Sequence, residues 1–402
     1  MASHPAASAQ PESFSSLRQQ FLLRLDITFL NHGSFGACPR PVFERYQKWQ
    51  RELEEQPVEF LGRRFAPMML EARTTLADYV KCSPDELVFV PNATTGLNTV
   101  ARSLTLQPGD EVLTTDHEYG ALDRTWLSVC RARGASYVRR TIPLPVHTAD
   151  EVVEWVWSGV TPRTRVLFLS HITSPTALVL PVAGLVRLAR EAGITTVIDG
   201  AHAPGQIPLD LASLGADFYS GNCHKWLCAP KGSAFLFARR DVQGMIDPLV
   251  VSWGWNRDAD TMRPSRFVDE NEWQGTRDVA AYLTVPAAIQ FQADHDWPRV
   301  RDRCHALLRD VRQRLSDLTG LTPPCPDSRD WYGQMASFPL PPCDATMLQE
   351  GLYRQYGVEV PVVEWQGRQL VRVSIQAYNS PADVQVLVKA LASLLRDTTK
   401  GL

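Results

Sequence analysis

Short apolar runs alternate with longer amphipathic stretches through the middle of the chain. Seven runs rich in leucine, β-branched and aromatic residues predict strands, at residues 87–90, 112–115, 136–138, 165–170, 195–199, 217–219 and 233–237. Between them, apolar residues recur at helical spacing, at residues 97–104, 119–133, 149–157 and 183–192. This alternation predicts an α/β fold in which a mostly parallel seven-stranded sheet lies between two layers of helices.

The pattern differs on both sides of this region. Before it come a short strand at residues 27–30 and helices at 39–56 and 66–80. After it, a long helical stretch from about 284 to 318, broken near 297–298, leads into a smaller α+β region. That region has strands at residues 335–338, 358–363 and 370–375 and helices at 346–356 and 381–395.

These two patterns predict two domains. We expect a large domain at residues 27–285 and a small C-terminal domain at residues 286–402, on which the N-terminal segment is a candidate to pack. Residues 1–26 begin with a stretch rich in Ala, Ser and Pro that lacks the basic-then-apolar order of a signal peptide. We therefore predict that they form a disordered leader.

Composition narrows the classes of function. The 402 residues are 44% hydrophobic and 21% charged, with a formal net charge of −3 and both signs interspersed. This balance does not indicate nucleic-acid binding or a polybasic membrane anchor, and no apolar run approaches the ~20 residues that span a bilayer. Eight scattered cysteines without a CxxC pair predict reduced thiols in a cytoplasmic protein and no metal site.

Polar clusters follow several predicted strands, at the carboxyl ends where ligands gather in parallel sheets. At residues 92–96 (NATTG), hydroxyls and free N–H groups at a helix start could hold an anion, although Thr94 could instead simply cap the helix. At residues 116–119 (DHEY), a ring could stack on a flat cofactor. The alternative there is a capping aspartate followed by a solvated histidine and glutamate.

Two charged residues of the predicted sheet need a physical explanation. Asp199 ends a buried strand, where a carboxylate is costly unless it pairs with a cation or a metal, and further metal ligands at suitable spacing are lacking. The protonated pyridine nitrogen of pyridoxal 5′-phosphate (PLP) is such a cation. Lys225 lies in a mostly apolar segment and could form a Schiff base with PLP, although taken alone it reads as a surface lysine. An anion site, an aspartate and a lysine at the ends of different strands together favour PLP.

Residues 199–205 (DGAHAPG) and 221–232 (GNCHKWLCAPKG) resemble the class V aminotransferase group of fold-type I PLP-dependent enzymes. Within this group, the chain is similar to the isopenicillin N epimerase-like branch, also through residues 30–36 (LNHGSFG), 170–176 (SHITSPT) and 372–379 (RVSIQAYN). The resemblance extends from about Phe29 to the last helix. It implies a PLP enzyme that acts on an amino acid and forms a homodimer with shared active sites.

The resemblance also implies a role for individual residues. Lys225 would carry the Schiff base and move protons at the substrate Cα, while Asp199 would pair with the pyridine nitrogen. His202, with Ser174 or Thr173, would lie near the phenolic oxygen. The phosphate would be held by Thr94, Thr95, Asn222 and His224, with Thr276 of the neighbouring subunit.

Three further residues complete the implied site. Tyr119 would stack on the cofactor ring, with His117 as the alternative. Arg372 would bind the substrate α-carboxylate, because a guanidinium can pair with a carboxylate through two hydrogen bonds. His32 is a further candidate for substrate binding.

The reaction is less constrained than the cofactor. Epimerisation at Cα is favoured by the resemblance but needs a second proton-transfer group, for which Tyr119, His117 or a water are the candidates. Cβ–S elimination, as in a C–S lyase, needs only Lys225 as base. Residues 358–371 lack the cysteine that a persulfide-forming desulfurase uses. An aminotransferase and a non-catalytic PLP-binding protein are the less favoured alternatives.

Overall fold

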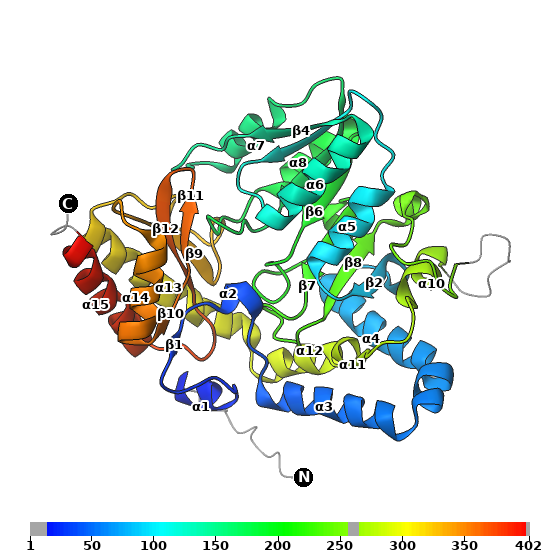
Figure 1. The fold of residues 1–402 in the computed structure, drawn as a ribbon, viewed down its shortest axis with the longest axis horizontal. Helices are drawn as coiled ribbons and strands as arrows, with labels where there is room; N and C mark the ends of the chain where they lie inside the picture. The colour runs from blue at the N-terminus through cyan, green and yellow to red at the C-terminus, as the bar shows by residue number, and fades with distance from the viewer. Residues whose placement is uncertain (1–13, 256–264, 399–402) are drawn as a thin grey trace, which may run out of the picture.

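The computed structural model describes residues 14–255 and 265–398, which contain a seven-stranded sheet and a separate three-stranded sheet (Figure 1). In the large sheet, β8 runs antiparallel to both of its neighbours and the other pairs are parallel. The predicted α/β fold with a mostly parallel sheet is therefore confirmed. Its order is β2 (Leu87–Val90), β8 (Ala234–Ala238), β7 (Phe218–Asn222), β6 (Thr195–Asp199), β5 (Thr164–Ser170), β3 (Glu111–Thr115) and β4 (Ser136–Arg140).

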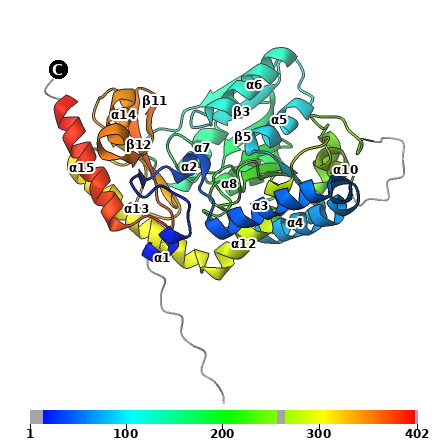
Figure 2. The same cartoon turned by 60° about the horizontal axis from the view of Figure 1, so that its bottom comes forward.

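Alternate residues of these strands point to opposite faces, and each face has its own apolar core. Val166 and Phe168 of β5 pack into one core with helices α5 (Ala93–Ser103) and α6 (Gly120–Arg133). Leu167 and Leu169 face the other core. Its helices are α4 (Phe65–Val80), α7 (Ala149–Trp157), α8 (Val182–Glu191) and α12 (Val285–Asp294). Figure 2 shows α5 and α6 on the side of the sheet away from α4 and α12. Burial on both faces explains why the strands are almost continuously apolar.

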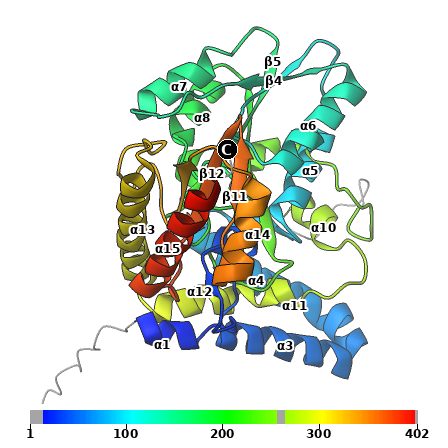
Figure 3. The ribbon, with the colours of Figure 1, turned by 60° about the vertical axis from the view of Figure 1, so that its left-hand side comes forward.

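The C-terminal part of the chain forms the small antiparallel sheet, in the order β11 (Val362–Trp365), β12 (Arg368–Ser374) and β9 (Met335–Leu340). Helices α13 (Trp297–Thr319), α14 (Ala345–Tyr356) and α15 (Pro381–Thr398) lie beside it (Figure 3). The predicted strand at residues 358–363 is two strands, β10 (Val358–Glu359) and β11. Pro361 lies between them and has no N–H with which to continue a ladder.

The N-terminal segment packs on the C-terminal part of the chain. Strand β1 (Thr28–Phe29) pairs in parallel with β10, after helix α1 (Phe14–Gln19). Leu17 and Phe21 are buried, and the Phe21 ring lies 4.9 Å from that of Tyr378. The prediction of a disordered leader at residues 1–26 is therefore wrong for residues 14–26, and its remainder lies outside the described residues. In the described part of the chain, none of the helices has both the length and the apolar character needed to span a membrane.

Candidate active site

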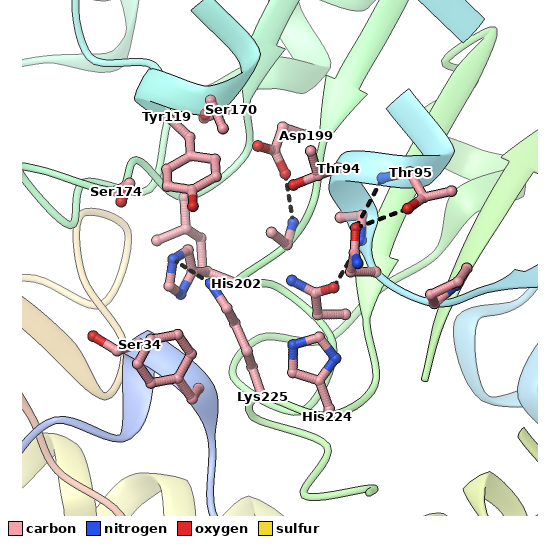
Figure 4. Close-up of a pocket in the computed structure, with 18 of the residues that line it drawn as sticks. Ser34, Thr94, Thr95, Tyr119, Ser170, Ser174, Asp199, His202, His224 and Lys225 are labelled. Carbon is pink, nitrogen blue, oxygen red and sulfur yellow. Dashed lines mark hydrogen bonds between the residues drawn. The ribbon is translucent and has the colours of Figure 1, made fainter. Parts of the chain in front are cut away.

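A cavity of about 630 Å³ opens at the carboxyl ends of the central strands of the large sheet (Figure 4). Residues from the ends of β5, β6 and β7, the start of α5 and the turn before α6 line it. Nine residues that the sequence analysis singled out are among them: Thr94, Thr95, Tyr119, Ser174, Asp199, His202, Asn222, His224 and Lys225. Segments far apart in the sequence therefore meet at one cavity.

Lys225 follows β7 and reaches into the cavity, where its Nζ lies 3.1 Å from Nε2 of His202. The other ring nitrogen of His202, Nδ1, accepts a hydrogen bond from the indole N–H of Trp226 at 3.2 Å. A neutral His202 must therefore carry its proton on Nε2 and donate it to Lys225, which requires an uncharged amine with a free lone pair. Burial and the nearby charge of Arg372 lower the pKa of Lys225 to about 7, in agreement with this arrangement.

This pKa predicts how the PLP-free protein takes up its cofactor. Because only the neutral amine is a nucleophile, we expect the rate of PLP uptake to rise with pH up to about 7 and then to level off. A lysine with the ordinary pKa of 10.5 would give a rate that still rises well above pH 8. The measurement is the absorbance change after mixing PLP with apoprotein between about pH 5.5 and 9. A rate that continues to rise above pH 8 would show that the pKa of the Lys225 amine is not lowered.

Asp199 is the last residue of β6 and is 4% exposed. Its Oδ1 accepts a hydrogen bond from the Ala201 N–H at 2.8 Å, whereas its Oδ2 bonds to no residue that the structure describes. Burial raises the pKa of this carboxyl to about 6, which expresses the cost of a carboxylate without a full cationic partner. A protonated pyridine nitrogen facing Asp199 would remove that cost, so the residue fits PLP.

The start of α5 forms the candidate phosphate site. Asn92, and not Thr94, caps this helix: its Oδ1 accepts the N–H of Thr95 at 2.9 Å. The helix consequently begins at Ala93, four residues before the predicted start, and Thr94 remains free to line the cavity. The positive end of the helix dipole and the hydroxyls of Thr94 and Thr95 favour an anion there, although the N–H groups of Ala93 and Thr95 are already bonded to Asn222 and Asn92. Asn222 joins this helix end to β7 by accepting the Ala93 N–H at 2.9 Å.

Of the two rings proposed to stack on the cofactor, the structure places Tyr119 in the cavity. Tyr119 is 46% exposed and lies at the start of α6. His117 is fully buried, with Nδ1 2.7 Å from the Thr176 hydroxyl and its ring centroid 4.5 Å from that of Trp365. The alternative assignment to His117 therefore does not fit.

The structure does not place His32, the further candidate for substrate binding, in the cavity. His32 is fully buried, with Nδ1 2.9 Å from the Tyr378 hydroxyl and Nε2 3.0 Å from the carbonyl oxygen of Lys225. Its ring supports the backbone of the lysine and does not reach the cavity. Ser34 and Phe35, two and three residues further on, line the cavity instead.

Arg372 lies on β12 and is 6% exposed. Its Nη1 donates to the Ser174 carbonyl oxygen at 2.7 Å and its Nη2 donates to the Ser34 hydroxyl at 3.1 Å. Arg372 lines a second cavity of about 640 Å³, which shares Ser174 with the first. Its Nε is closed to solvent and has no hydrogen-bond partner among the described residues.

Thr276 lines neither cavity. It is exposed in the loop between α10 (Arg266–Glu272) and α11 (Ala280–Leu283). Its position is open to a neighbouring molecule.

The sequence analysis did not identify Glu118 and Ser170 as site residues, and one of its two interpretations made Glu118 a solvated glutamate. Glu118 is buried, and its two carboxyl oxygens accept hydrogen bonds from the hydroxyls of Thr115 and Ser170, each at 2.6 Å. Burial raises the pKa of Glu118 to about 8. Ser170 lines the cavity and pairs in register with Asp199, so the Glu118 carboxyl lies behind the Asp199 end of the cavity.

A lysine amine and a buried carboxylate converge here beside a helix N-terminus at the carboxyl edge of the sheet, an arrangement that defines a fold-type I PLP-dependent enzyme. The model of the aminotransferase class-V family matches residues 33–387, and the chain belongs to this family.

Curated relatives include two isopenicillin N epimerases and several L-cysteine desulfhydrases. The epimerase of Amycolatopsis lactamdurans is 40% identical over 395 residues, which cover 95% of this chain and 98% of the relative. The epimerase of Streptomyces clavuligerus is 36% identical, and the match covers 94% of this chain and 97% of the relative. A probable chloroplastic L-cysteine desulfhydrase of Arabidopsis thaliana is 28% identical and covers 93% and 84%.

Solved structures agree on the fold. The cysteine desulfurase CsdA of Escherichia coli has a TM-score of 0.79 at 22% identity, covering 97% of this chain and 100% of that one. The cystine C-S lyase C-DES, in complex with cysteine persulfide, also has a TM-score of 0.79 at 22% identity. The match covers 94% of this chain and 99% of that one.

Proposed function

We propose that this enzyme is an epimerase that inverts the α-carbon of the amino-acid end of isopenicillin N or a closely similar compound. The observation that carries the proposal is the 40% identity to an isopenicillin N epimerase along 95% of the chain, against 28–30% for the desulfhydrases. The geometry around Lys225 supports proton transfer at Cα in either reaction.

PLP, when bound, supplies an electron-withdrawing ring that stabilises negative charge at the substrate Cα. Lys225 would take the Cα proton as general base, with its amine positioned beside His202. Arg372 would bind the α-carboxylate and orient the substrate. Asp199 would pair with the pyridine nitrogen and keep it protonated.

The remaining residues hold and orient the cofactor in this proposal. The ring of Tyr119 would pack on the cofactor, and His202 with Ser174 would interact with its phenolic oxygen. Thr94, Thr95, Asn222 and His224 would hold the phosphate at the start of α5.

The experiment that tests the reaction uses the PLP-loaded enzyme and isopenicillin N in D₂O. Deuterium at Cα together with inverted configuration, and without a keto acid, supports epimerisation. Transfer of the amino group to a keto acid would show an aminotransferase, and a colourless, inactive protein in the presence of PLP would favour a non-catalytic binding role.

The second candidate function is a C–S lyase, since the desulfhydrase relatives extend over most of the chain and Lys225 is the only base that elimination needs. In the same assay, L-cysteine would then give pyruvate, ammonia and a released thiol. Persulfide chemistry is not supported, because residues 358–371 lack a cysteine and neither Cys325 nor Cys343 lines either of the two cavities.

Replacement of Arg372 by lysine is expected to weaken substrate binding. Lysine keeps the charge but loses the planar group that can make two parallel bonds to a carboxylate. Loss of one charged hydrogen bond corresponds to about a 10–100-fold rise in KM, with a smaller change in kcat. Steady-state kinetics measure both constants, and Arg368→Lys is the matched control because Arg368 is exposed on the same strand. Equal KM values for the two variants would contradict the role given to Arg372.

We also propose that the enzyme is a cytoplasmic homodimer in which Thr276 of each chain completes the phosphate site of its partner. The exposed position of Thr276 supports this, as do Phe35 and Trp253, which are 73% and 91% exposed. The expected mass in solution is twice the chain mass of 45.0 kDa, measured by light scattering. All eight cysteines are unpaired, as suits a reducing compartment, and cell fractionation tests this location.

Mixing two inactive variants tests the shared site. Lys225→Ala and Thr276→Glu, refolded together, should form hybrid dimers with one intact site each and restore about a quarter of the wild-type activity. A mixture that stays inactive, although hybrid dimers form, would contradict a contribution of Thr276 across the interface.

A further inference from the structure

Inversion at Cα requires a proton donor on the face opposite to the base. Five titratable side chains line the first cavity within the described part of the chain: Tyr119, Asp199, His202, His224 and Lys225. With Lys225 assigned as one proton-transfer group, the other must be sought among the remaining four.

Three of these four are committed elsewhere. His202 is bonded to Lys225 itself and to Trp226, so it acts on the same side as the lysine. His224 precedes Lys225 in the same loop, and its Nδ1 lies 3.0 Å from the carbonyl oxygen of Ser233. Asp199 would pair with the pyridine nitrogen of PLP, and its Oδ1 accepts the Ala201 N–H.

Tyr119 approaches the cavity from the opposite direction to Lys225. In the sheet order, β6 with Asp199 lies between β7, which leads to Lys225, and the pair β5 and β3, of which β3 leads to Tyr119. Figure 4 accordingly shows Tyr119 entering from the top and Lys225 from the bottom, with the Tyr119 hydroxyl pointing into the space between them. That hydroxyl makes no hydrogen bond to a described residue, so it is available to a ligand.

The guanidinium of Arg372 lies close enough to Tyr119 for the two side chains to interact electrostatically. Two other groups of the turn are committed elsewhere, because His117 is buried against Trp365 and both carboxyl oxygens of Glu118 accept hydrogen bonds from the hydroxyls of Thr115 and Ser170.

We propose that the Tyr119 hydroxyl is the second proton-transfer group, on the face of Cα opposite to Lys225. This inference rests on the proposed epimerase function. Lys225 removes the proton from one face, so that the Cα–H bond breaks and its electron pair stays with the substrate. That pair then takes the proton of the Tyr119 hydroxyl on the other face. The phenolate and the lysine ammonium regain their starting states by proton exchange with solvent, and nothing is oxidised or reduced.

The Tyr119→Phe variant separates this role from ring packing, because phenylalanine keeps the ring and removes only the hydroxyl. The PLP-loaded variant is incubated in D₂O with each epimer of isopenicillin N. Inversion should fall by about 10²–10⁴-fold, the usual contribution of a general acid or base. The epimer whose Cα–H faces Lys225 should still exchange deuterium with retention, whereas the other epimer should not exchange. The PLP dissociation constant of the apoprotein, from an absorbance titration, should change little.

Tyr353→Phe is the matched control, since Tyr353 is similarly exposed (44%) but lies on α14, and it should behave as wild type. Inversion that persists in Tyr119→Phe would overturn the inference and leave the epimerase function standing. A variant that loses retention exchange and PLP affinity as well would also overturn it, because Tyr119 would then only hold the cofactor. If the wild-type enzyme itself does not invert either epimer, the proposed function fails and the inference fails with it.

Discussion

Lys225→Ala is expected to lower kcat by at least about 10³-fold, because the variant loses both the cofactor-linking amine and the base at Cα. The neutral amine held by His202 cannot be replaced from within the cavity, since His202 is itself in contact with Lys225 and has its other nitrogen bonded to Trp226. Single-turnover kinetics at saturating PLP measure the effect on the chemical step, and the absorbance spectrum shows whether the cofactor is still bound.

Lys81→Ala is the control for loss of a lysine. The Lys81 side chain is 66% exposed, and its Nζ lies 3.4 Å from Asp210. An isolated surface pair of this kind contributes about 0–1 kcal/mol to stability, so activity should stay at the wild-type level. A Lys225→Ala enzyme with full activity would overturn the assignment of this chain to PLP chemistry at Lys225.

The large sheet was predictable because its strands are buried on both faces, which leaves an apolar run in the sequence at each strand. The N-terminal segment was not predictable in the same way. Its order depends on contacts with residues more than 300 positions away, such as the pairing of β1 with β10 and the contact of Phe21 with Tyr378. Composition at the start of the chain carries no information about such partners.

In the site as well, residues whose role depends on their sequence neighbours could be predicted, whereas residues whose role depends on distant contacts could not. Asp199 and Lys225 could be identified because a charged residue among apolar neighbours has a large desolvation cost that demands a partner. The orientation of His32 could not, because the choice between His32 and Phe35 depends on how α2 (His32–Phe35) lies against the lysine loop. A Cβ on Gly36 would lie 2.0 Å from the carbonyl oxygen of His224, and this close approach fixes the segment. Glu118 was misjudged because the hydroxyl of Ser170 comes from another strand.

Asp199→Asn is expected to lower kcat/KM, with the second largest effect after Lys225→Ala. Asparagine has the same shape and can still accept the Ala201 N–H, but it has no charge with which to hold a protonated pyridine nitrogen. Removal of one partner of a buried ion pair costs about 3–5 kcal/mol, which corresponds to roughly 10²–10⁴-fold in kcat/KM. Asp210→Asn is the control, since Asp210 is a partly exposed helix cap for which asparagine is an equally good replacement.

The pH dependence of PLP binding gives this prediction a second, independent measurement. Burial raises the pKa of Asp199 to about 6, so the carboxyl is ionised above that pH and becomes protonated below it. Both proteins are compared in the Lys225→Ala background, where the lysine cannot titrate, and the phosphate of PLP titrates equally in each. Loss of the lysine charge raises the pKa of Asp199 further. The affinity of Lys225→Ala apoprotein for PLP should therefore fall as the pH drops through a value above about 6, whereas the protein that also carries Asp199→Asn should lack this part of the dependence. Parallel affinity profiles from about pH 5 to 8 would show that Asp199 does not carry the charge that pairs with the cofactor.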